Sequence, residues 1–255
     1  MPLQLLNRDA DRKPYGTPYG EIPESDSVDV LWNWLEDTLR DAYGVDGMFY
    51  ITYPVGDAAG TLAEMLERAV WKTSYEPAFL EAIGGNILNH DRSGLIVLET
   101  GRMCRWDDPA IFDNPTKGEK RRLELNAEHD MDVGACLPLH TSGGRICGGV
   151  GVRSRHLPAE EFYAAITEDE AVLTQLLAAF DARFRGPLAS ETFHITAQEK
   201  KVLAHIAGGM GVLRAAHELH LSPKTVEFYM RSVRMKTRSA TTAEAVAKAV
   251  FFNML

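Results

Sequence analysis

The side chains best suited to a chemical role lie near the C-terminus, where cationic, hydroxyl and aromatic residues recur along one expected helix. They are Lys224, Thr225, Glu227, Phe228, Arg231, Arg234, Lys236 and Arg238. Arginine can donate two hydrogen bonds to a guanine edge, and threonine can contact a thymine methyl group. Arg234, Lys236 and Arg238 suit backbone phosphates. A merely solvated helix face is the plain alternative, but the pattern predicts a surface that binds duplex DNA.

The elements that would position these side chains have clear boundaries. Each of three helices is opened by a residue whose side chain can accept a hydrogen bond from the first turn: Thr196, Ser222 and Thr241. Helices are expected at about 196–208, 212–219, 222–236 and 241 to near the C-terminus. The second and third are predicted to form a helix-turn-helix, in which the second helix of the pair lies in a DNA major groove.

Composition places the chain among folded proteins with two domains. Its 255 residues suit two domains, and 25% charged with 45% hydrophobic residues is near the average for globular proteins. The net charge of −9 is uneven, because residues 191–255 carry +4 and residues 1–190 carry −13. A basic module on an acidic body is compatible with DNA binding, since attraction depends on the local patch that faces the phosphates.

The cysteines and the hydropathy of the sequence indicate in which cellular compartment the protein works. The three cysteines, Cys104, Cys136 and Cys147, include no CxxC pair, which disfavours a disulfide framework and a zinc site. The sequence has no run of about 18 apolar residues and no basic N-terminal segment followed by an apolar core. We therefore expect a cytoplasmic protein without a membrane segment, a metal or a cofactor.

The N-terminal part is predicted to be an extended arm (1–24) followed by a domain at 25–185. Its expected elements are a helix at 27–44, a strand at 48–55, a helix capped by Thr61 and Glu64 with a strand up to Tyr75, a helix at 76–83, a hairpin over 133–152, and a helix opened by Thr167 and Glu170. Gly186-Pro187 is expected to end this helix, which leaves a linker at 186–194 and a second domain at 195–255. Strands flanked by helices predict an α/β/α sandwich, and an α+β class for the whole chain.

The C-terminal segment resembles the LuxR-type helix-turn-helix family. The resemblance covers about 60 residues and is carried by ITAQEKKVLAHIAGGM, LSPKTVEFYMRSVRMK and TTAEAVAKA. Two departures are the GVLRA sequence at 211–215 in the second helix and Thr237, where leucine is common. The resemblance implies a transcription regulator. Because one module offers a small contact area, we expect a homodimer on an inverted repeat in double-stranded DNA.

Residues from Ser27 to Phe184 resemble the autoinducer-binding domain of quorum-sensing LuxR regulators. The resemblance is carried by SYEPAF, by Asp91 with Trp106 fifteen positions later, and by GACLPLHTSGG. It implies a PAS- or GAF-like sensing fold with a ligand cavity. The residues expected to line that cavity are Tyr75, Phe79, Ile83, Asp91 and Trp106. In this family Asp91 would accept a hydrogen bond from the amide N–H of an acyl-homoserine lactone.

Three residues depart from the pattern of that domain. Phe79 stands where a tryptophan holds the lactone carbonyl, Ile83 where a tyrosine contacts the ligand, and Arg92 where proline is usual. Phenylalanine and isoleucine cannot donate hydrogen bonds, so we expect a small, largely apolar ligand with one donor group, for which an acyl-homoserine lactone is one candidate. A buried Asp91 would require a ligand, water or a neighbour such as Arg92 as its partner.

Three alternative functions stay open at this point. The first is a LuxR-type transcription factor without a ligand, and the second is a phosphorylated response regulator. The third is a small-molecule enzyme fused to the helix-turn-helix, which would use His90-Asp91 with Cys104, or His129-Asp130. A lone His-Asp pair lacks further metal ligands, and no GxSxG, P-loop or GxGxxG motif occurs. We therefore expect no enzymatic activity.

Overall fold

The computed structural model describes residues 20–54, 68–84, 88, 90–141 and 143–255. Most of the expected arm, and the capping pair Thr61 and Glu64, lie outside the described residues and stay predictions. The chain divides into two units between Asp181 and Ala182, and the short segment Asp26–Val28 belongs to the second unit. The expected domain boundaries also stay predictions.

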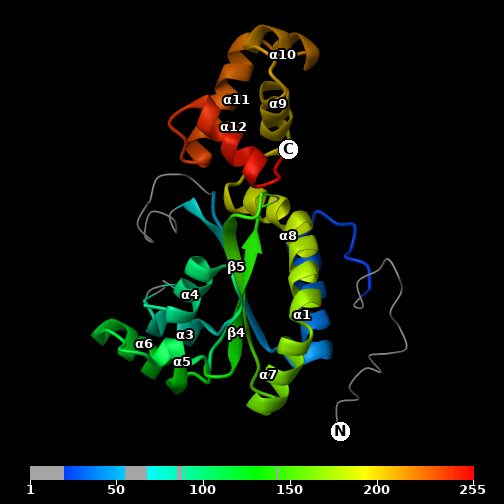
Figure 1. Cartoon of the computed structure of the whole chain (residues 1–255). Coiled ribbons are helices and arrows are strands. Elements are labelled where there is room, and N and C mark those ends of the chain that lie inside the picture. The colour runs from blue at the N-terminus through cyan, green and yellow to red at the C-terminus, as the bar shows by residue number, and fades with distance from the viewer. Residues whose placement is uncertain (1–19, 55–67, 85–87, 89, 142) are drawn as a thin grey trace. The chain divides into compact units, whose positions relative to one another are not determined.

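The first unit is built around a five-stranded antiparallel sheet with the strand order β2-β1-β5-β4-β3 (Figure 1). The strands are β1 (Gly47–Thr52), β2 (Val70–Thr73), β3 (Cys104–Arg105), β4 (Gly134–His140) and β5 (Ile146–Arg153). The predicted hairpin is confirmed as β4 and β5. Side chains alternate between the two faces of a strand, so Phe49 and Ile51 share one face while Tyr50 points to the other.

Helices cover both faces of this sheet, which confirms the predicted sandwich (Figure 1). They are α1 (Val28–Tyr43), α3 (Pro77–Ala82), α4 (Arg92–Thr100), α5 (Pro109–Phe112), α6 (Lys117–Glu128), α7 (Ala159–Glu168) and α8 (Glu170–Thr192). The Tyr50 hydroxyl donates a hydrogen bond to Asp181 of α8, and the Trp34 ring of α1 stacks on Phe180. The helices α3 to α6 lie on the opposite face.

Two expected helix ends are wrong. Thr167 does not open a helix, because it lies in the last turn of α7, and α8 begins separately at Glu170. Gly186-Pro187 does not end α8, which continues to Thr192 through part of the expected linker. A Cβ at Gly186 would collide with the carbonyl oxygen of Asn253, so this glycine serves a close contact. Pro187 removes one helical hydrogen bond, but buried side chains on either side of it stabilise the helix: Phe184, Leu188 and Ala189.

The second unit contains the four predicted helices. They are α9 (Ala197–Ala207), α10 (Val212–Glu218), α11 (Pro223–Lys236) and α12 (Thr242–Phe251). The predicted caps Thr196, Ser222 and Thr241 each accept a hydrogen bond from the backbone N–H three residues later. The core between the helices is made of Val202, Leu203, Ala215, Ala216, Val226, Met230, Val233, Ala245 and Ala249. The helix-turn-helix is therefore confirmed as α10 and α11.

A buried ion cluster joins three parts of the first unit. Arg153, at the end of β5, has no exposed surface. Its guanidinium donates to Asp46, just before β1, at 3.0 Å and to Glu76, just before α3, at 2.6 Å. Hydrogen bonds from Arg153 overcome the effect of partial burial and lower the pKa of Glu76 to about 2. The cluster thus fixes where α3 begins relative to the sheet.

We predict that Glu76→Gln lowers the free energy of unfolding by about 1 kcal/mol at pH 7, because a charge-assisted pair is lost at a site that is 41% exposed. A carboxyl with a depressed pKa contributes stability above its unfolded value and loses that contribution as the pH falls toward its folded value. The difference between wild type and variant should therefore shrink between pH 4.5 and pH 2. Urea unfolding at several pH values measures it.

The matched control is Glu81→Gln, because Glu81 lies on the same helix with its side chain exposed. This variant should unfold like the wild type at every pH. Equal stability of Glu76→Gln and Glu81→Gln at pH 7 would contradict the assigned role of the cluster.

Candidate functional site

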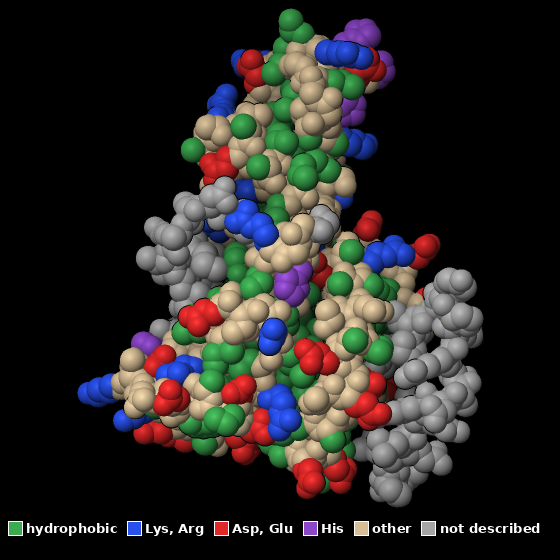
Figure 2. Space-filling model, in the orientation of Figure 1, with side chains coloured by type: hydrophobic (Ala, Val, Ile, Leu, Met, Phe, Trp, Pro, Cys, Tyr) green, Lys and Arg blue, Asp and Glu red, His purple; other side chains and the backbone are tan. Residues whose placement is uncertain are grey.

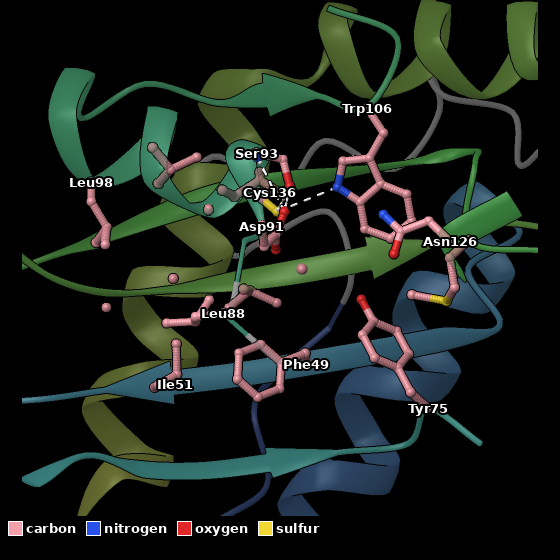
Figure 3. A pocket seen from close by; sticks show the side chains of 18 of the residues that line it. Phe49, Ile51, Tyr75, Leu88, Asp91, Ser93, Leu98, Trp106, Asn126 and Cys136 are labelled. Atoms are coloured by element: carbon pink, nitrogen blue, oxygen red, sulfur yellow. Dashed lines mark hydrogen bonds between the residues drawn. The ribbon is translucent and has the colours of Figure 1, made fainter. Parts of the chain in front are cut away.

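A cavity lies in the first unit between α4 and the face of the sheet that carries Phe49 (Figure 3). It encloses about 640 Å³ of space not filled by atoms, its opening to solvent included. Its apolar wall consists of Phe49, Ile51, Leu88, Val97, Leu98, Leu137 and Val150. Mostly apolar walls with a few polar groups among them are typical of small-molecule sites.

Glycines of β5 and β4 keep this space open. A Cβ at Gly151 would lie 3.0 Å from the Tyr75 hydroxyl oxygen and 3.8 Å from Cβ of Phe49. A Cβ at Gly134 would collide with the indole ring of Trp106. Larger residues at these positions would displace the two aromatic side chains at the polar end of the cavity.

Asp91 lines the cavity and also caps α4. Its Oδ1 accepts hydrogen bonds from the backbone N–H of Ser93 at 3.1 Å and from the Ser93 hydroxyl at 2.7 Å. Among the described residues, Oδ2 has no hydrogen-bond partner. The neighbour that Asp91 uses is therefore Ser93. Arg92, which the sequence suggested, instead donates to the Ala110 carbonyl and pairs with Glu119.

Tyr75 points its hydroxyl into the cavity from the segment between β2 and α3 (Figure 3). Burial, and after it the nearby Cys136, raises the pKa of Tyr75 well above its ordinary value, so the hydroxyl keeps its proton at neutral pH. No group in the described part of the chain forms a hydrogen bond with this hydroxyl. Tyr75 therefore offers a donor to a ligand.

Trp106 lines the cavity with its ring, while its indole N–H is already used. Nε1 donates to Sγ of Cys136 at 3.3 Å, and Ser93 Oγ lies 3.3 Å from the same sulfur (Figure 3). Burial, followed by the charge of Asp91, raises the pKa of Cys136 to about 12, so the thiol stays neutral. Trp106, Cys136 and Ser93 thus form one connected polar group that orients Asp91.

Phe79 and Ile83 do not line this cavity, contrary to the prediction. Both are buried in an apolar cluster with Phe49, Tyr75 and Met131. The Phe79 ring meets Tyr75 edge-on, with centroids 6.0 Å apart. These two residues pack behind the wall of the cavity, and other residues line the space that they were expected to line.

That lining comes from α6, which sequence reasoning did not include. Arg122 and Asn126 both line the cavity, and Nε of Arg122 donates to Oδ1 of Asn126 at 2.8 Å. The Arg122 guanidinium lies over the Phe79 ring, 5.3 Å from its centroid. A readable signal existed, because the capping box at Thr116 opens this helix and the spacing of four places Arg122 and Asn126 on one face.

The second unit carries the residues predicted to contact DNA on α11, except for Arg238, which follows its end. Lys224, Glu227, Phe228, Arg231 and Arg238 are exposed, with Phe228 at 59%. Thr225, Arg234 and Lys236 are partly buried. Met235 is 73% exposed on the same stretch and was not singled out from the sequence. On the face drawn in Figure 2, acidic side chains gather instead over the α6 and α7 end of the first unit.

Lys236 takes part in an internal network that joins α9 to α11. Its Nζ donates to Glu199 Oε2 at 2.6 Å and to the His194 carbonyl at 2.8 Å. Ser232 donates to the other oxygen of Glu199. Burial raises the pKa of Glu199, but the hydrogen bonds from Lys236, Ser232 and Thr196 outweigh it and hold that pKa at about 2.

Two known families match this chain. Residues 28–182 match the autoinducer binding domain, and residues 194–249 match the bacterial regulatory proteins of the luxR family. The chain belongs to the LuxR-type regulators. The resemblances seen in the sequence are thereby confirmed, and the regulator combines an autoinducer-binding domain with a helix-turn-helix DNA-binding domain.

Solved structures similar to this regulator include SdiA of Escherichia coli, which is 14% identical over 91% of this chain and 93% of that chain, with a TM-score of 0.46. VqmA of Vibrio cholerae is 22% identical over 48% of this regulator and 47% of that chain, with a TM-score of 0.24. No curated protein matches the regulator significantly. Within the described ranges, none of its helices is long and apolar enough to span a membrane.

For this regulator we predict that Lys236→Met destabilises the helix-turn-helix, because it leaves the carboxylate of Glu199 buried without its cation, at a cost of about 2 kcal/mol. Hydrogen exchange of the α9 and α11 amides, followed by mass spectrometry on the full chain, should become faster by more than tenfold. All four tryptophans precede residue 182, so fluorescence would not report this change.

Arg238→Met is the control, since Arg238 is exposed two residues further along. Its amide exchange should match that of the wild type. If Lys236→Met also left amide exchange unchanged, the network would not stabilise the packing of α9 on α11, and Lys236 would be available for phosphates.

Proposed function

We propose that this LuxR-type regulator binds duplex DNA through the exposed side chains of α11, and that a small amide-bearing ligand in the cavity controls its activity. The observation that supports the ligand is a pair of polar atoms at the cavity, Oδ2 of Asp91 and the hydroxyl of Tyr75. Neither has a hydrogen-bond partner among the described residues, and both residues line the cavity, so a ligand there can bond to both atoms.

For DNA we assign base contacts to α11 from its first turn to Arg231, and phosphate contacts to the end of α11 and to Arg238 just after it. Lys224, Thr225 and Arg231 can hydrogen-bond base edges, and Glu227 can accept from a cytosine amino group. The exposed Phe228 ring can contact thymine methyl groups. Arg238 and Arg234 reach phosphates, whereas Lys236 contributes less because Glu199 already holds its ammonium group. A homodimer on an inverted repeat supplies the second half-site.

We predict that a triple substitution of Lys224, Thr225 and Arg231 by alanine abolishes sequence-specific retention of an operator selected from random duplexes. Each lost bidentate base contact removes about 1–3 kcal/mol of discrimination. Gel retardation gives the affinity, and native mass spectrometry of the complex counts two chains per duplex.

Arg238→Ala serves as the comparison, because loss of a phosphate contact should weaken all sequences alike and reduce the salt slope by about one. Unchanged operator binding by the triple variant would rule out the assignment of α11 as the reading helix. A one-to-one complex would rule out the homodimer.

For the ligand, an amide fits the two polar atoms together. Its N–H can donate to Oδ2 of Asp91, and its carbonyl can accept from the Tyr75 hydroxyl. The acyl chain attached to that amide would then occupy the apolar wall around Phe49 and Val97. Burial of such a chain stabilises the complex by about 0.8 kcal/mol per methylene.

We predict that Asp91→Asn weakens binding of N-octanoyl-homoserine lactone or N-octanoylglycine, whichever the wild type binds, by about tenfold, since a hydrogen bond to a charged group is lost. Asparagine also caps helices well, so α4 should persist. Replacing the ligand amide by an ester, which removes the N–H, should weaken wild-type binding to a similar extent. Isothermal titration calorimetry measures all of these affinities.

Asp108→Asn is the matched control, because Asp108 caps α5 in the same way but does not line the cavity. It should bind like the wild type. Equal affinity of the wild type for amide and ester would exclude Asp91 as the acceptor of the ligand.

A further inference from the structure

One polar side chain of the cavity lies away from the others. Tyr53 directly follows β1 and lines the cavity together with Phe49 and Ile51, because side chains alternate along a strand. Tyr53 is only 7% exposed, and its hydroxyl group has no hydrogen-bond partner in the part of the chain that the structure describes. The ligand contacts proposed above leave this hydroxyl unused.

The register of the sheet places Tyr53 far from Tyr75. The hydroxyl oxygen of Tyr75 would lie 3.0 Å from a Cβ at Gly151, which pairs with Phe49. The backbone N–H of Tyr53 instead donates to the carbonyl of Cys147 at 2.9 Å, four residues earlier on β5. A strand rises about 3.3 Å per residue, so the two positions are about 13 Å apart along the sheet. Tyr53 is therefore distant from the proposed amide contacts.

The wall between these two positions is apolar. Ile51 of β1 and Gly149 of β5 pair there, and both line the cavity, as does Leu98 of α4. Figure 3 shows Ile51 and Leu98 on the side of the cavity opposite Tyr75. An acyl chain that starts at the amide contacts would run along this wall toward Tyr53.

The hydroxyl group of Tyr53 is a hydrogen-bond donor at neutral pH. Burial, and after it the nearby Cys147, raises the pKa of Tyr53 to about 12. The hydroxyl therefore keeps its proton and can donate to an oxygen atom of a bound molecule. A plain alkyl tail would leave this donor without a partner, whereas a hydroxyl or ketone oxygen far along the tail would accept its hydrogen bond.

We propose that the ligand carries a second oxygen, as a hydroxyl or a ketone, near the far end of its acyl chain, and that the Tyr53 hydroxyl donates a hydrogen bond to it. This inference rests on the proposed ligand function, which places the amide between Asp91 and Tyr75. It makes the ligand an acyl amide with an oxygenated tail. A polar group that is buried without a hydrogen bond weakens binding, so such a tail depends on Tyr53.

The test is a thermodynamic cycle on the full chain, measured by isothermal titration calorimetry. Octanoyl and decanoyl amides of homoserine lactone or glycine, whichever the wild type binds, are compared with their terminal hydroxyl derivatives and with ketones one carbon before the end. All are titrated into the wild type and Tyr53→Phe, which keeps the ring and removes only the hydroxyl. We expect Tyr53→Phe to weaken at least one oxygenated ligand by about fivefold or more, and to leave the plain ligands unchanged.

Tyr163→Phe is the control, because Tyr163 is a buried tyrosine of the same unit that does not line the cavity. This variant should bind plain and oxygenated ligands with the affinities of the wild type. The difference between the two variants then assigns the tail contact to the hydroxyl of Tyr53.

Two results would overturn the inference and differ in what else they affect. If Tyr53→Phe changed plain and oxygenated ligands by the same factor at both chain lengths, the tail contact would be excluded while amide binding itself stood. If none of the compounds bound to wild-type protein that retained specific DNA, both the oxygenated tail and the proposed amide-bearing ligand would fail.

Discussion

The buried guanidinium of Arg153 organises the first unit. A charge without exposed surface is tolerated only when paired, so Asp46 and Glu76 must both reach it when the sheet and α3 come together. Tyr75 directly precedes Glu76, and the Arg153 guanidinium lies 5.7 Å from the centre of its ring. The hydroxyl that enters the cavity is thus positioned by an ion cluster outside it.

Asp91 shows how one carboxylate can serve both the fold and a ligand. One oxygen is consumed by the cap of α4, where a negative charge is also favourable for the helix. The second oxygen is held in a fixed direction by that cap, and Ser93 links the same carboxylate to Cys136 and Trp106. A ligand donor would therefore meet an acceptor that is already oriented, which reduces the entropy lost on binding.

Features of the fold that depend on neighbouring residues could be predicted from the sequence. The caps Thr196, Ser222 and Thr241 and the β4–β5 hairpin depend on neighbours a few residues away, and the structure agrees with them. The errors arose where a distant contact decides. Gly186-Pro187 has the composition of a helix end, yet the carbonyl of Asn253 explains the glycine and burial retains the helix.

In the candidate site, too, local motifs could be read from the sequence and contacts between distant elements could not. Tyr75, Asp91 and Trp106 could be placed from motifs whose spacing was intact. The helix that carries Arg122 could be read from its capping box, but the contact of Arg122 with Phe79, which lies 43 positions earlier in the sequence, could not. In the sequence, Phe79 differs from the family pattern only by lacking the hydrogen-bond donor of a tryptophan. In the structure, its ring packs against the guanidinium of Arg122 from α6.

The net positive charge of the second unit overstates the number of cations available to DNA. Lys248 is buried and donates to the carbonyls of Thr237 and Arg238, and Lys236 is held by Glu199. Both lysines count toward the positive charge of this segment, but both neutralise internal acceptors instead of facing solvent. The attraction of α11 for phosphates must then come from fewer cations than the sequence contains. If α11 contacts DNA as proposed, recognition of a particular sequence would depend more on the exposed Glu227, Phe228 and Arg231, whose contacts vary with the base.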